Sequence, residues 1–589
     1  MNFLKSFLAS ILGTIVAFIF IGIVFFMAIA GIASAFGTEA VTEVEVKENS
    51  ILALDLDLPV KDNVASTKEF EQVLGLGDDV LKFNNVIAAI KKAAKDENIK
   101  GIDLHSQFPS MGWSQAQSIR KVLNEFKAEG KFIYSFGDYY SQKGYYLASV
   151  SDSIFLHPQG GMEFKGLAAE VLYYKDFQEK YGFKMEVVRH GKYKSAVEPY
   201  LESEMSEANR TQIQSLLNSV WGTVSEEIET SRSLSSAKLK SIAEELSARL
   251  PEKAMEVGLI DGLLYENDYK AKLKTALGLE QDDKIRKTNL NRLTSGNSLY
   301  KKGVRERIAV IYAQGPVLYG EGSEYIIGQE VFLDAIKDAV ENRRVKAIVL
   351  RIDSPGGNAL SSDIIWNALM KAKEEKPLVV SLGNVAASGG YYLAVAGDEI
   401  YANDLSITGS IGVFATVPNV KQFTESIGIN AQHVMTHKNA LGFSLFQSPS
   451  GEFRASIKEG IEHVYETFKE RVAEGRNMTL EEVEAIAQGR VWTGKQALEN
   501  GLVDGLGGLE QALEAAARLA ELEEYNLISY PKIEPEFDDF LSVMGPFGSI
   551  QEQLTANYPK EIQAFLTTLT QKTERPNIEI RLPYTVEIK

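Results

Sequence analysis

The chain of 589 residues repeats part of itself at a nearly constant spacing. The pentapeptide GYYLA occurs at Gly144–Ala148 and again at Gly390–Ala394, an offset of 246 residues. The same offset aligns further positions: KGIDL with KAIVL around Gly101 and Ala347, Ile90 with Ile336, Pro109 with Pro355, Gly137 with Gly383 and Asp152 with Asp398. GLIDGL and GLVDGL follow at a slightly smaller offset. Such long self-similarity indicates a duplication, so the chain is expected to fold as two related units.

Each copy contains the same succession of helical and strand patterns. An amphipathic helix, expected at residues 86–95 and again at 333–342, precedes a short apolar strand. The expected strands, given for the first and then the second copy, are residues 99–104 and 345–352, 132–136 and 378–382, and 154–161 and 400–409. Strands that alternate with helical patterns predict βαβ units and a largely parallel sheet. The expected fold class is therefore α/β, in two tandem copies.

The duplication divides the chain into four expected segments. They are an N-terminal membrane anchor, residues 1–45; a first repeat, residues 46–295; a second repeat, residues 296–530; and a C-terminal tail, residues 531–589, to which the sequence assigns no role. The boundary between the repeats falls in the polar, basic stretch Asn289–Gly303, which is expected to be a linker.

The anchor is expected because no charged residue occurs from Ser6 to Thr38. A helix needs roughly 20 apolar residues to span a bilayer, whereas the core of a signal peptide has roughly 7–15. Lys5 precedes the span and Glu39 follows it, so the positive-inside rule places the N-terminus in the cytoplasm and the large body outside. A long cleavable signal is the alternative, because Ala-Ser-Ala occurs at Ala33–Ala35.

Composition excludes several functions. The 62 Lys and Arg residues against 80 Asp and Glu residues give a net charge of -18, which argues against broad binding to nucleic acid. The absence of cysteine excludes disulfides, thiolate nucleophiles and Cys-ligated metals. No HExxH pattern and no acidic cluster with ligand spacing occurs, so neither a metal nor another cofactor is expected.

The second copy carries the turn Asp353–Gly357 directly after its first strand, and its last two residues are Gly356 and Gly357. Two glycines after proline allow a tight turn with amide N–H groups directed at a ligand, as in an oxyanion hole. The equivalent residues of the first copy, Phe108–Met111, lack the glycine pair. A plain structural turn is the other interpretation of this segment.

A serine and a lysine also distinguish the copies. Ser410, in the segment Ile407–Gly412, has Phe164 as its counterpart, whereas Lys194 has Ala440. One copy therefore holds a lysine and the other a serine, which indicates either one composite site or independent drift. A nucleophilic serine needs a base, and a desolvated lysine is one possibility. Lys192 is a rival base, but it has a counterpart in Lys438.

Other arrangements stay open on spacing alone. The six histidines (His105, His157, His190, His433, His437 and His463) lie in no recognisable catalytic motif, and the G-x-S-x-G elbow is absent. A Ser-His-Asp triad assembled in space is nevertheless compatible with the sequence. Ser388 and Gly389 are expected near the site, at the start of a helix.

The segments TGSIGVFA, IDSPGG, ASGGYYLA and YKSAVEP closely resemble the long, duplicated signal peptide peptidases of the S49 serine peptidase family. The resemblance covers most of the chain and implies a tandem ClpP/crotonase-like fold with a Ser–Lys dyad. It implies Ser410 as the nucleophile and Lys194 as the general base. Gly356 and Gly357 are the candidate oxyanion-hole residues.

The resemblance also implies a cellular setting. We expect a bowl-shaped homotetramer, anchored by a single span in the inner membrane with its catalytic body on the periplasmic side. Its partners would be cleaved signal peptides and other hydrophobic peptides, which it degrades after their release from preproteins. The alternatives are a crotonase-like acyl-CoA enzyme, a non-catalytic membrane scaffold and a protease with broader targets.

Overall fold

The computed structural model describes residues 46–64, 80–294, 301–323, 325–532 and 578–581, together with Gly13 and Phe20. The expected membrane helix and nearly all of the expected anchor, residues 1–45, lie outside these residues. Within the described part of the chain, no helix is both long enough and apolar enough to cross a bilayer.

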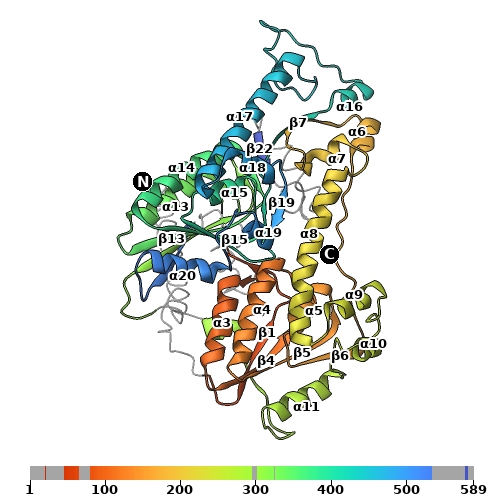
Figure 1. Ribbon diagram of the computed structural model, residues 1–589, viewed down its shortest axis with the longest axis vertical. Helices are drawn as coiled ribbons and strands as arrows, with labels where there is room; N and C mark the ends of the chain where they lie inside the picture. Colours follow the sequence, from red (N-terminus) through yellow and green to blue (C-terminus); the bar gives the residue numbers. More distant parts are fainter. Residues whose placement is uncertain are drawn as a thin grey trace, which may run out of the picture.

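The first copy forms a six-stranded sheet in the order β8-β6-β5-β4-β1-β9, in which every pairing is parallel. Its strands are β1 (Ser50–Asp55), β4 (Ile99–His105), β5 (Phe132–Tyr140), β6 (Ser153–Met162), β8 (Gly262–Leu263) and β9 (Arg286–Asn289). Helices α3 (Phe83–Lys95) and α4 (Trp113–Ala128) contribute to the core on one face, and α11 (Glu266–Ala276) covers the other (Figure 1). Apolar strands covered on both faces are typical of parallel sheets.

The second copy repeats this order as β20-β16-β15-β13-β10-β21. These strands are β10 (Arg307–Gln314), β13 (Val345–Ser354), β15 (Leu378–Ala387), β16 (Glu399–Ala402), β20 (Gly505–Leu506) and β21 (Asn526–Tyr530). Helices α13 (Gln329–Glu341) and α14 (Ala359–Glu375) belong to the core on one face, and α20 (Leu509–Leu519) covers the other. The α/β fold and its duplication are therefore confirmed.

The repeated motifs make matched contacts in the two copies. The first tyrosine of each GYYLA segment is buried and donates its hydroxyl to the backbone of the later GLxDGL motif. Tyr145 bonds to Leu259 O at 2.8 Å, and Tyr391 bonds to Leu502 O at 2.7 Å. The repeat in the sequence is thus a repeat of tertiary contacts, which explains why widely separated motifs recur together.

Two details differ from the sequence-based expectation. The strand expected at 400–409 is divided into β16 and β17 (Ile407–Gly409), with a turn between them in which Ser406 N bonds to Asn403 O. β17 pairs with β15 and, antiparallel, with β19 (Val491–Thr493). The start of the expected linker instead forms the end of β9 and α12 (Leu290–Thr294), because Leu290 and Leu293 are buried in the first core.

A third sheet contains strands of both copies, in the order β12-β11-β14-β22-β18-β7. These strands are β7 (Lys184–His190), β11 (Val317–Leu318), β12 (Ile327–Gly328), β14 (Gly356–Asn358), β18 (Val413–Asn419) and β22 (Ile578–Arg581). β7 of the first copy pairs antiparallel with β18 of the second, from His190 opposite Val413 to Lys184 opposite Asn419. This pairing brings the segment after β7 close to the segment before β18.

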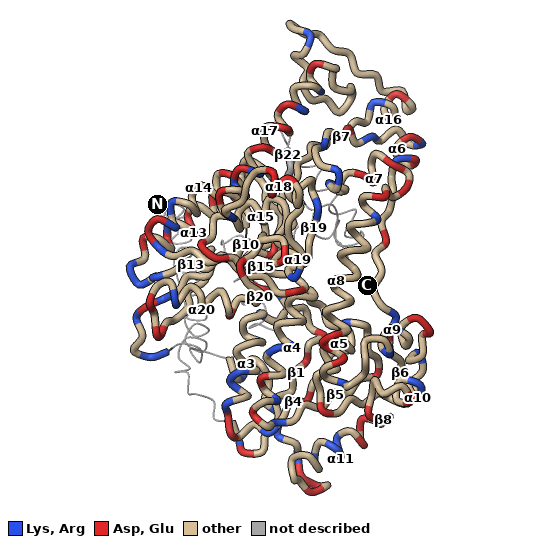
Figure 2. The backbone as a smooth tube through the Cα atoms, in the orientation of Figure 1, with Lys and Arg blue, Asp and Glu red and all other residues tan. Residues whose placement is uncertain are grey.

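Charged residues lie mainly along the outer helices, among them α11, α20 and α17 (Gly451–Arg476), where both signs are mixed (Figure 2). A buried exception joins the two copies. Arg351 of β13 pairs with Asp62 of the first copy, with 2.5 Å between Nε and Oδ2, and both side chains are almost fully buried. An ion pair removed from water in this way needs accurate geometry, so it helps to define how the copies meet.

Candidate active site

The strand pairing of the third sheet brings Lys194 and Ser410 together. Lys194 follows β7 and precedes a short 3₁₀ turn, Ser195–Val197, whereas Ser410 lies between β17 and β18. Lys194 Nζ is 3.0 Å from Ser410 Oγ and 3.0 Å from Ser410 O. Both residues belong to one chain, so a single subunit supplies both halves of this pair.

Ser410 has an unusual backbone conformation. Its φ is 54°, in the left-handed region that residues other than glycine seldom adopt. Such a conformation costs about 1–3 kcal/mol and persists only where surrounding contacts impose it. One such contact is the hydrogen bond from Ser410 N to Arg490 O, at 2.7 Å. The turn thereby directs the hydroxyl at the lysine.

The environment of Lys194 favours an uncharged amine. The side chain is fully buried, and its hydrogen-bond partners are neutral: Ser410 Oγ, Ser410 O and Ser388 Oγ, the last at 2.8 Å. Burial lowers the pKa of Lys194 well below its ordinary value, because a charged amine loses its hydration. A neutral amine at this distance can accept a proton from the serine hydroxyl.

The segment Gln488–Arg490 connects the lysine segment to the serine segment through backbone hydrogen bonds. Tyr193 N donates to Gln488 O at 2.8 Å, and Gly489 N donates to Ile411 O at 2.7 Å. Gly489 has a φ of 78°, and a Cβ built on it would lie 2.6 Å from Lys194 Cβ. Glycine is therefore required at this position both by conformation and by space.

Gln212, on α8 (Glu207–Arg232), is a site residue that the sequence did not reveal. Its buried amide donates from Nε2 to Tyr193 O at 3.1 Å and to Ser195 Oγ at 2.6 Å, on either side of Lys194. Its Oε1 accepts from Val491 N on β19, the strand paired with β17. A glutamine in a long helix gives no sequence signal, because only the fold shows what its amide contacts.

Comparison with known proteins identifies the family. The model of Peptidase family S49 matches residues 125–280 and 370–523, one stretch in each copy. The chain belongs to peptidase family S49. It is therefore a serine peptidase, as the resemblance in the sequence predicted.

Curated relatives agree with this assignment. Protease 4 of Salmonella typhi is 34% identical over 510 residues, which cover 84% of this chain and 81% of the relative. Serine protease SPPA, chloroplastic, of Arabidopsis thaliana is 31% identical over 510 residues, covering 85% of this chain and 74% of the relative. Protease 4 of Haemophilus influenzae is 31% identical over 526 residues, covering 85% of each chain.

In this S49 peptidase, Ser388 lies immediately before α15 (Gly389–Ala394). Its φ is 55°, also in the left-handed region, and its N–H donates to Gly409 O at 2.8 Å, next to the serine. The turn between β15 and α15 is thus bonded to the turn that carries Ser410. The expectation that Ser388 lies near the site agrees with this geometry.

The glycine pair of the peptidase lies at the start of β14. Gly356 N donates to Ser354 Oγ at 3.1 Å, so this amide already has a partner. A Cβ built on Gly389 would lie 3.1 Å from Gly357 N, so the Gly357 amide abuts the start of α15, beside Ser388. Gly357 also lies in the sheet, opposite Val317 of β11 and Ile580 of β22, so the two glycines remain joint candidates to face a substrate carbonyl.

The rival bases have other surroundings. Lys192 is exposed, and its Nζ lies 5.5 Å from the centre of the Tyr193 ring. The His190 ring pairs with Glu462 at 2.8 Å and stacks on Tyr465. The remaining histidines are also engaged or at least partly exposed: His105 pairs with Asp103, His157 packs on Tyr265, His433 is half-buried, and His437 and His463 are exposed.

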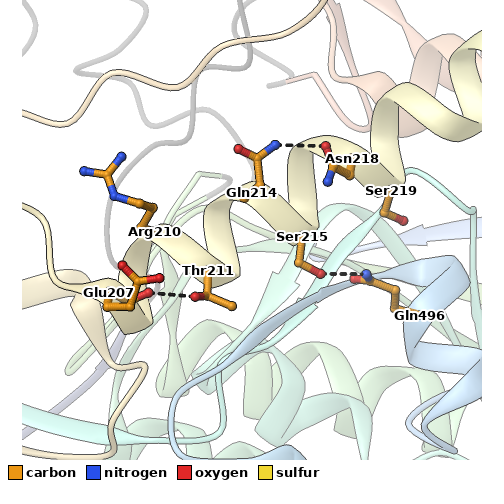
Figure 3. A pocket seen from close by; sticks show the side chains of 8 residues that line it. All are labelled: Glu207, Arg210, Thr211, Gln214, Ser215, Asn218, Ser219 and Gln496. Atoms are coloured by element: carbon orange, nitrogen blue, oxygen red, sulfur yellow. Dashed lines mark hydrogen bonds between the residues drawn. The ribbon is translucent and has the colours of Figure 1, made fainter.

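A polar hollow lies on another face of α8 (Figure 3). Its side chains bond mainly to one another: Gln214 donates to Asn218 at 2.9 Å, and Gln496 donates to Ser215 at 3.1 Å. The lining residues are Glu207, Arg210, Thr211, Gln214, Ser215, Asn218, Ser219 and Gln496. Neither Lys194 nor Ser410 lines this hollow, so it is separate from the candidate active site.

Proposed function

We propose that this S49 peptidase cleaves peptide bonds with Ser410 as the nucleophile and Lys194 as the general base. The single observation that supports this most strongly is the 3.0 Å separation of Lys194 Nζ and Ser410 Oγ in a fully buried setting. The asymmetry of the copies supports it as well, because each copy lacks the partner that the other provides.

The proposed reaction has two stages. In the first, neutral Lys194 takes the proton of Ser410 while Oγ attacks the carbonyl carbon of the scissile peptide. The resulting ammonium then gives this proton to the leaving amine, and an acyl-enzyme remains. In the second stage, Lys194 takes a proton from a water molecule whose oxygen attacks the ester carbonyl carbon. The ammonium then returns this proton to Ser410 Oγ as the ester bond breaks and the acid is released.

The oxyanion of both tetrahedral intermediates would be held by backbone N–H groups. We assign this role to the turn of Gly356 and Gly357, which lies at the start of β14 and abuts the start of α15 beside Ser388. Fixed amides stabilise developing charge without reorganisation, and losing one such donor typically costs about 10²–10³ in kcat.

The proposed substrates are cleaved signal peptides and similar hydrophobic peptides left in the membrane. The uncharged stretch from Ser6 to Thr38 supports a single-pass anchor that would hold the catalytic body at the periplasmic side of the inner membrane. Family resemblance supports a tandem ClpP/crotonase-like fold and a homotetramer. A relative named as a serine protease SPPA is compatible with this role.

The test of the dyad is cleavage of a fluorogenic hydrophobic peptide by the full chain in detergent. We expect Ser410→Ala and Lys194→Ala each to reduce kcat by about 10³ or more, whereas Lys192→Ala retains activity. Circular dichroism and size-exclusion chromatography would establish that the variants remain folded and assembled. An active Lys194→Ala protein would reject lysine as the base.

The substrate class needs a separate test. A synthetic signal peptide and a peptide of equal length from a mature, soluble protein would be compared in the presence of lipid vesicles. Preferential cleavage of the signal peptide would support the proposed role. Equal cleavage of both would instead favour a protease with broader targets.

A further inference from the structure

Strand β15 is irregular directly before the candidate active site, and a carboxylate holds the irregular part. The pairing of β13 with β15 shifts at Asp353, which lies opposite the three residues Gly383–Val385. Asp353 Oδ1 accepts a hydrogen bond from Val385 N at 3.0 Å, and Oδ2 accepts from Asn384 Nδ2 at 3.1 Å. Bulges of this kind re-aim the residues that follow them and are frequent next to active sites.

The residues after this bulge lead to both members of the dyad. Val385–Ala387 pair with Ile407–Gly409 of β17, the strand that ends directly before Ser410. The next residue of the chain, Ser388, bonds to Lys194 Nζ. The carboxylate that holds the bulge therefore lies at the base of the segments that carry the serine and orient the lysine.

The first copy contains the same bulge without the charge. Gln107 is the counterpart of Asp353 at the offset of 246 residues. Its Oε1 accepts from Asp138 N at 3.0 Å and from Tyr139 N at 3.1 Å, and these are the counterparts of the two residues that Asp353 binds. A neutral amide is therefore enough to hold the bulge, and the copy that carries the serine has an ionisable group in its place.

Asp353 shares its surroundings with one cation and a second carboxylate. The charged groups that act on it are Arg351, on the same strand, and Asp62, which follows β2 (Val60–Lys61) of the first copy. Arg351 is already engaged, because its Nε pairs with Asp62 and its Nη1 donates to Ser381 Oγ. Burial and the charge of Asp62 raise the pKa of Asp353 to about 6. This carboxylate therefore binds a proton in mildly acidic solution.

We propose that Asp353 is a positioning residue of this peptidase, whose ionised carboxylate keeps the dyad in its active geometry and whose protonation loosens it. This inference rests on the proposed function, because the carboxylate acts through the segments of Ser388 and Ser410. The ionised group accepts both hydrogen bonds, and charge-assisted bonds are roughly twice as strong as neutral ones. Protonation removes the charge and turns one carboxyl oxygen into a donor.

Asn384 cannot adapt to a protonated Asp353 without breaking a contact between the copies. Its Oδ1 accepts from Gln115 N, in the first turn of α4, at 3.2 Å. Turning the amide of Asn384 around to offer its oxygen to the new O–H would place the amide nitrogen against that N–H. The proton therefore costs a hydrogen bond in either orientation, and the bulge loses a support.

The dependence of cleavage on pH separates this role from a merely structural one. The assay is kcat/KM for a fluorogenic hydrophobic peptide, with the full chain in detergent, from about pH 5 to about pH 8. Asp353→Asn copies the protonated state, because its amide N–H faces Asn384 as the carboxyl O–H would. Asp353→Gln introduces the residue of the first copy, whose oxygen can hold the bulge without titrating.

Asp398→Asn is the matched control. Asp398 also accepts from a backbone N–H of β15, that of Leu378 at 2.8 Å, but at the end of the strand away from the site. Its counterpart Asp152 binds Ile133 N in the same way, also at 2.8 Å, so this carboxylate is common to both copies. The rate of Asp398→Asn relative to the wild type should therefore stay constant with pH.

We expect the wild type to exceed Asp353→Asn about 10-fold at about pH 8 but only about two-fold at about pH 5, because Asp353 is mostly protonated at the lower pH. Asp353→Gln should be more active than Asp353→Asn, and should gain about five-fold on the wild type over the same fall in pH. Lys194 titrates in all three proteins, so its ionisation cancels from these ratios.

Ratios that stay constant with pH in both variants would overturn the inference and make Asp353 a structural residue only. If Asp353→Asn fails to fold, the ratio of Asp353→Gln to the wild type decides alone. The two proposals also fail in different ways. If Ser410→Ala still cleaves the peptide, the proposed dyad fails and the inference fails with it; if cleavage needs Ser410 but the ratios are constant, the dyad survives without this role for Asp353.

Discussion

Lys194 Nζ lies 3.0 Å from Ser410 Oγ although the two residues are 216 positions apart and belong to different copies of the duplication. The antiparallel pairing of β7 with β18 explains this proximity, because it aligns His190 with Val413. In this register the end of β7 lies beside the start of β18, so the turn after β7 and the turn before β18 meet at the same end of the two strands. Five predictions follow from the surroundings of this pair.

The rate of cleavage should depend on pH through Lys194. Only the neutral amine accepts a proton, so activity rises as pH rises through the pKa of Lys194. Since burial lowers this pKa well below the ordinary value of 10.5, the rise in activity should lie well below pH 10.5. A profile of kcat/KM from about pH 5 to about pH 10 measures this dependence on pH. Lys194→Arg should be inactive throughout, and wild-type activity that begins to rise only at the upper end of this range would contradict the prediction.

Replacing the buried amine should stabilise the protein. The pKa of Lys194 is lowered in the folded state, so the unfolded chain binds more protons below the ordinary value of 10.5. The resulting penalty is absent above that pH and grows as pH falls toward the lowered pKa. Lys194→Met should therefore raise the free energy of unfolding by about 0.5–2 kcal/mol at pH 7, and by less at pH 10. Urea denaturation at both values, with Lys192→Met as control, checks this; equal gains at both would refute it.

Ser388→Ala should reduce kcat more than it changes KM. The hydroxyl of Ser388 lies 2.8 Å from Lys194 Nζ and helps to orient the amine toward Ser410. Losing a hydrogen bond between neutral groups costs about 0.5–1.5 kcal/mol, which corresponds to a loss of about 2–10-fold. Steady-state kinetics would be compared with Ser135→Ala, a buried serine of the first copy. Equal effects of the two variants would show that Ser388 has no special role.

Gln212→Ala should misplace the lysine. The amide bonds on both sides of Lys194 and to β19, so its loss releases the lysine segment from the serine-bearing sheet. We expect kcat to fall about 10-fold or more, since a net loss of one to two hydrogen bonds costs about 1–3 kcal/mol. Gln214→Ala, on the hollow-facing side of the same helix, is the control. A Gln212→Ala protein with normal kcat would contradict this role.

Gly489→Ala should inactivate the enzyme through steric conflict. The added Cβ would lie 2.6 Å from Lys194 Cβ, so one of the two segments must move. Gly428→Ala offers a close control, because Gly428 has a similar φ of 83° but open space around it. Both variants should lose about 1 kcal/mol of stability from backbone strain, and only Gly489→Ala should lose activity. Equal activity of both would exclude the conflict.

Much of the fold follows from local sequence pattern. The apolar strand pattern at 345–352 corresponds to β13, and the helical period at 333–342 corresponds to α13, because burial of one face or of a whole strand imposes its own spacing. The division of residues 400–409 into β16 and β17 was not predictable in this way. It depends on hydrogen bonds between Asn403 and α4 of the other copy.

The candidate site was only partly visible in the sequence. Comparing the copies singled out Ser410 and Lys194, since a duplication makes an asymmetric residue conspicuous. Nothing in the comparison of the two copies singled out Gln212 or Gly489, because their importance lies in contacts with backbone atoms of distant segments. The tail gave no indication of β22, a strand of four residues whose pairing needs both β14 and β18 to be in place.

The sequence by itself therefore determined the duplication, the α/β class, the family and the two residues that distinguish the copies. These depend on local periodicity and on internal comparison, which the linear order of residues carries. Only the tertiary structure decided that Lys194 and Ser410 meet within one chain, that Ser388 and Gln212 hold the lysine, and that β22 lies between β14 and β18. Those relationships depend on cross-copy strand register and on desolvation, which arise only when distant segments pack together.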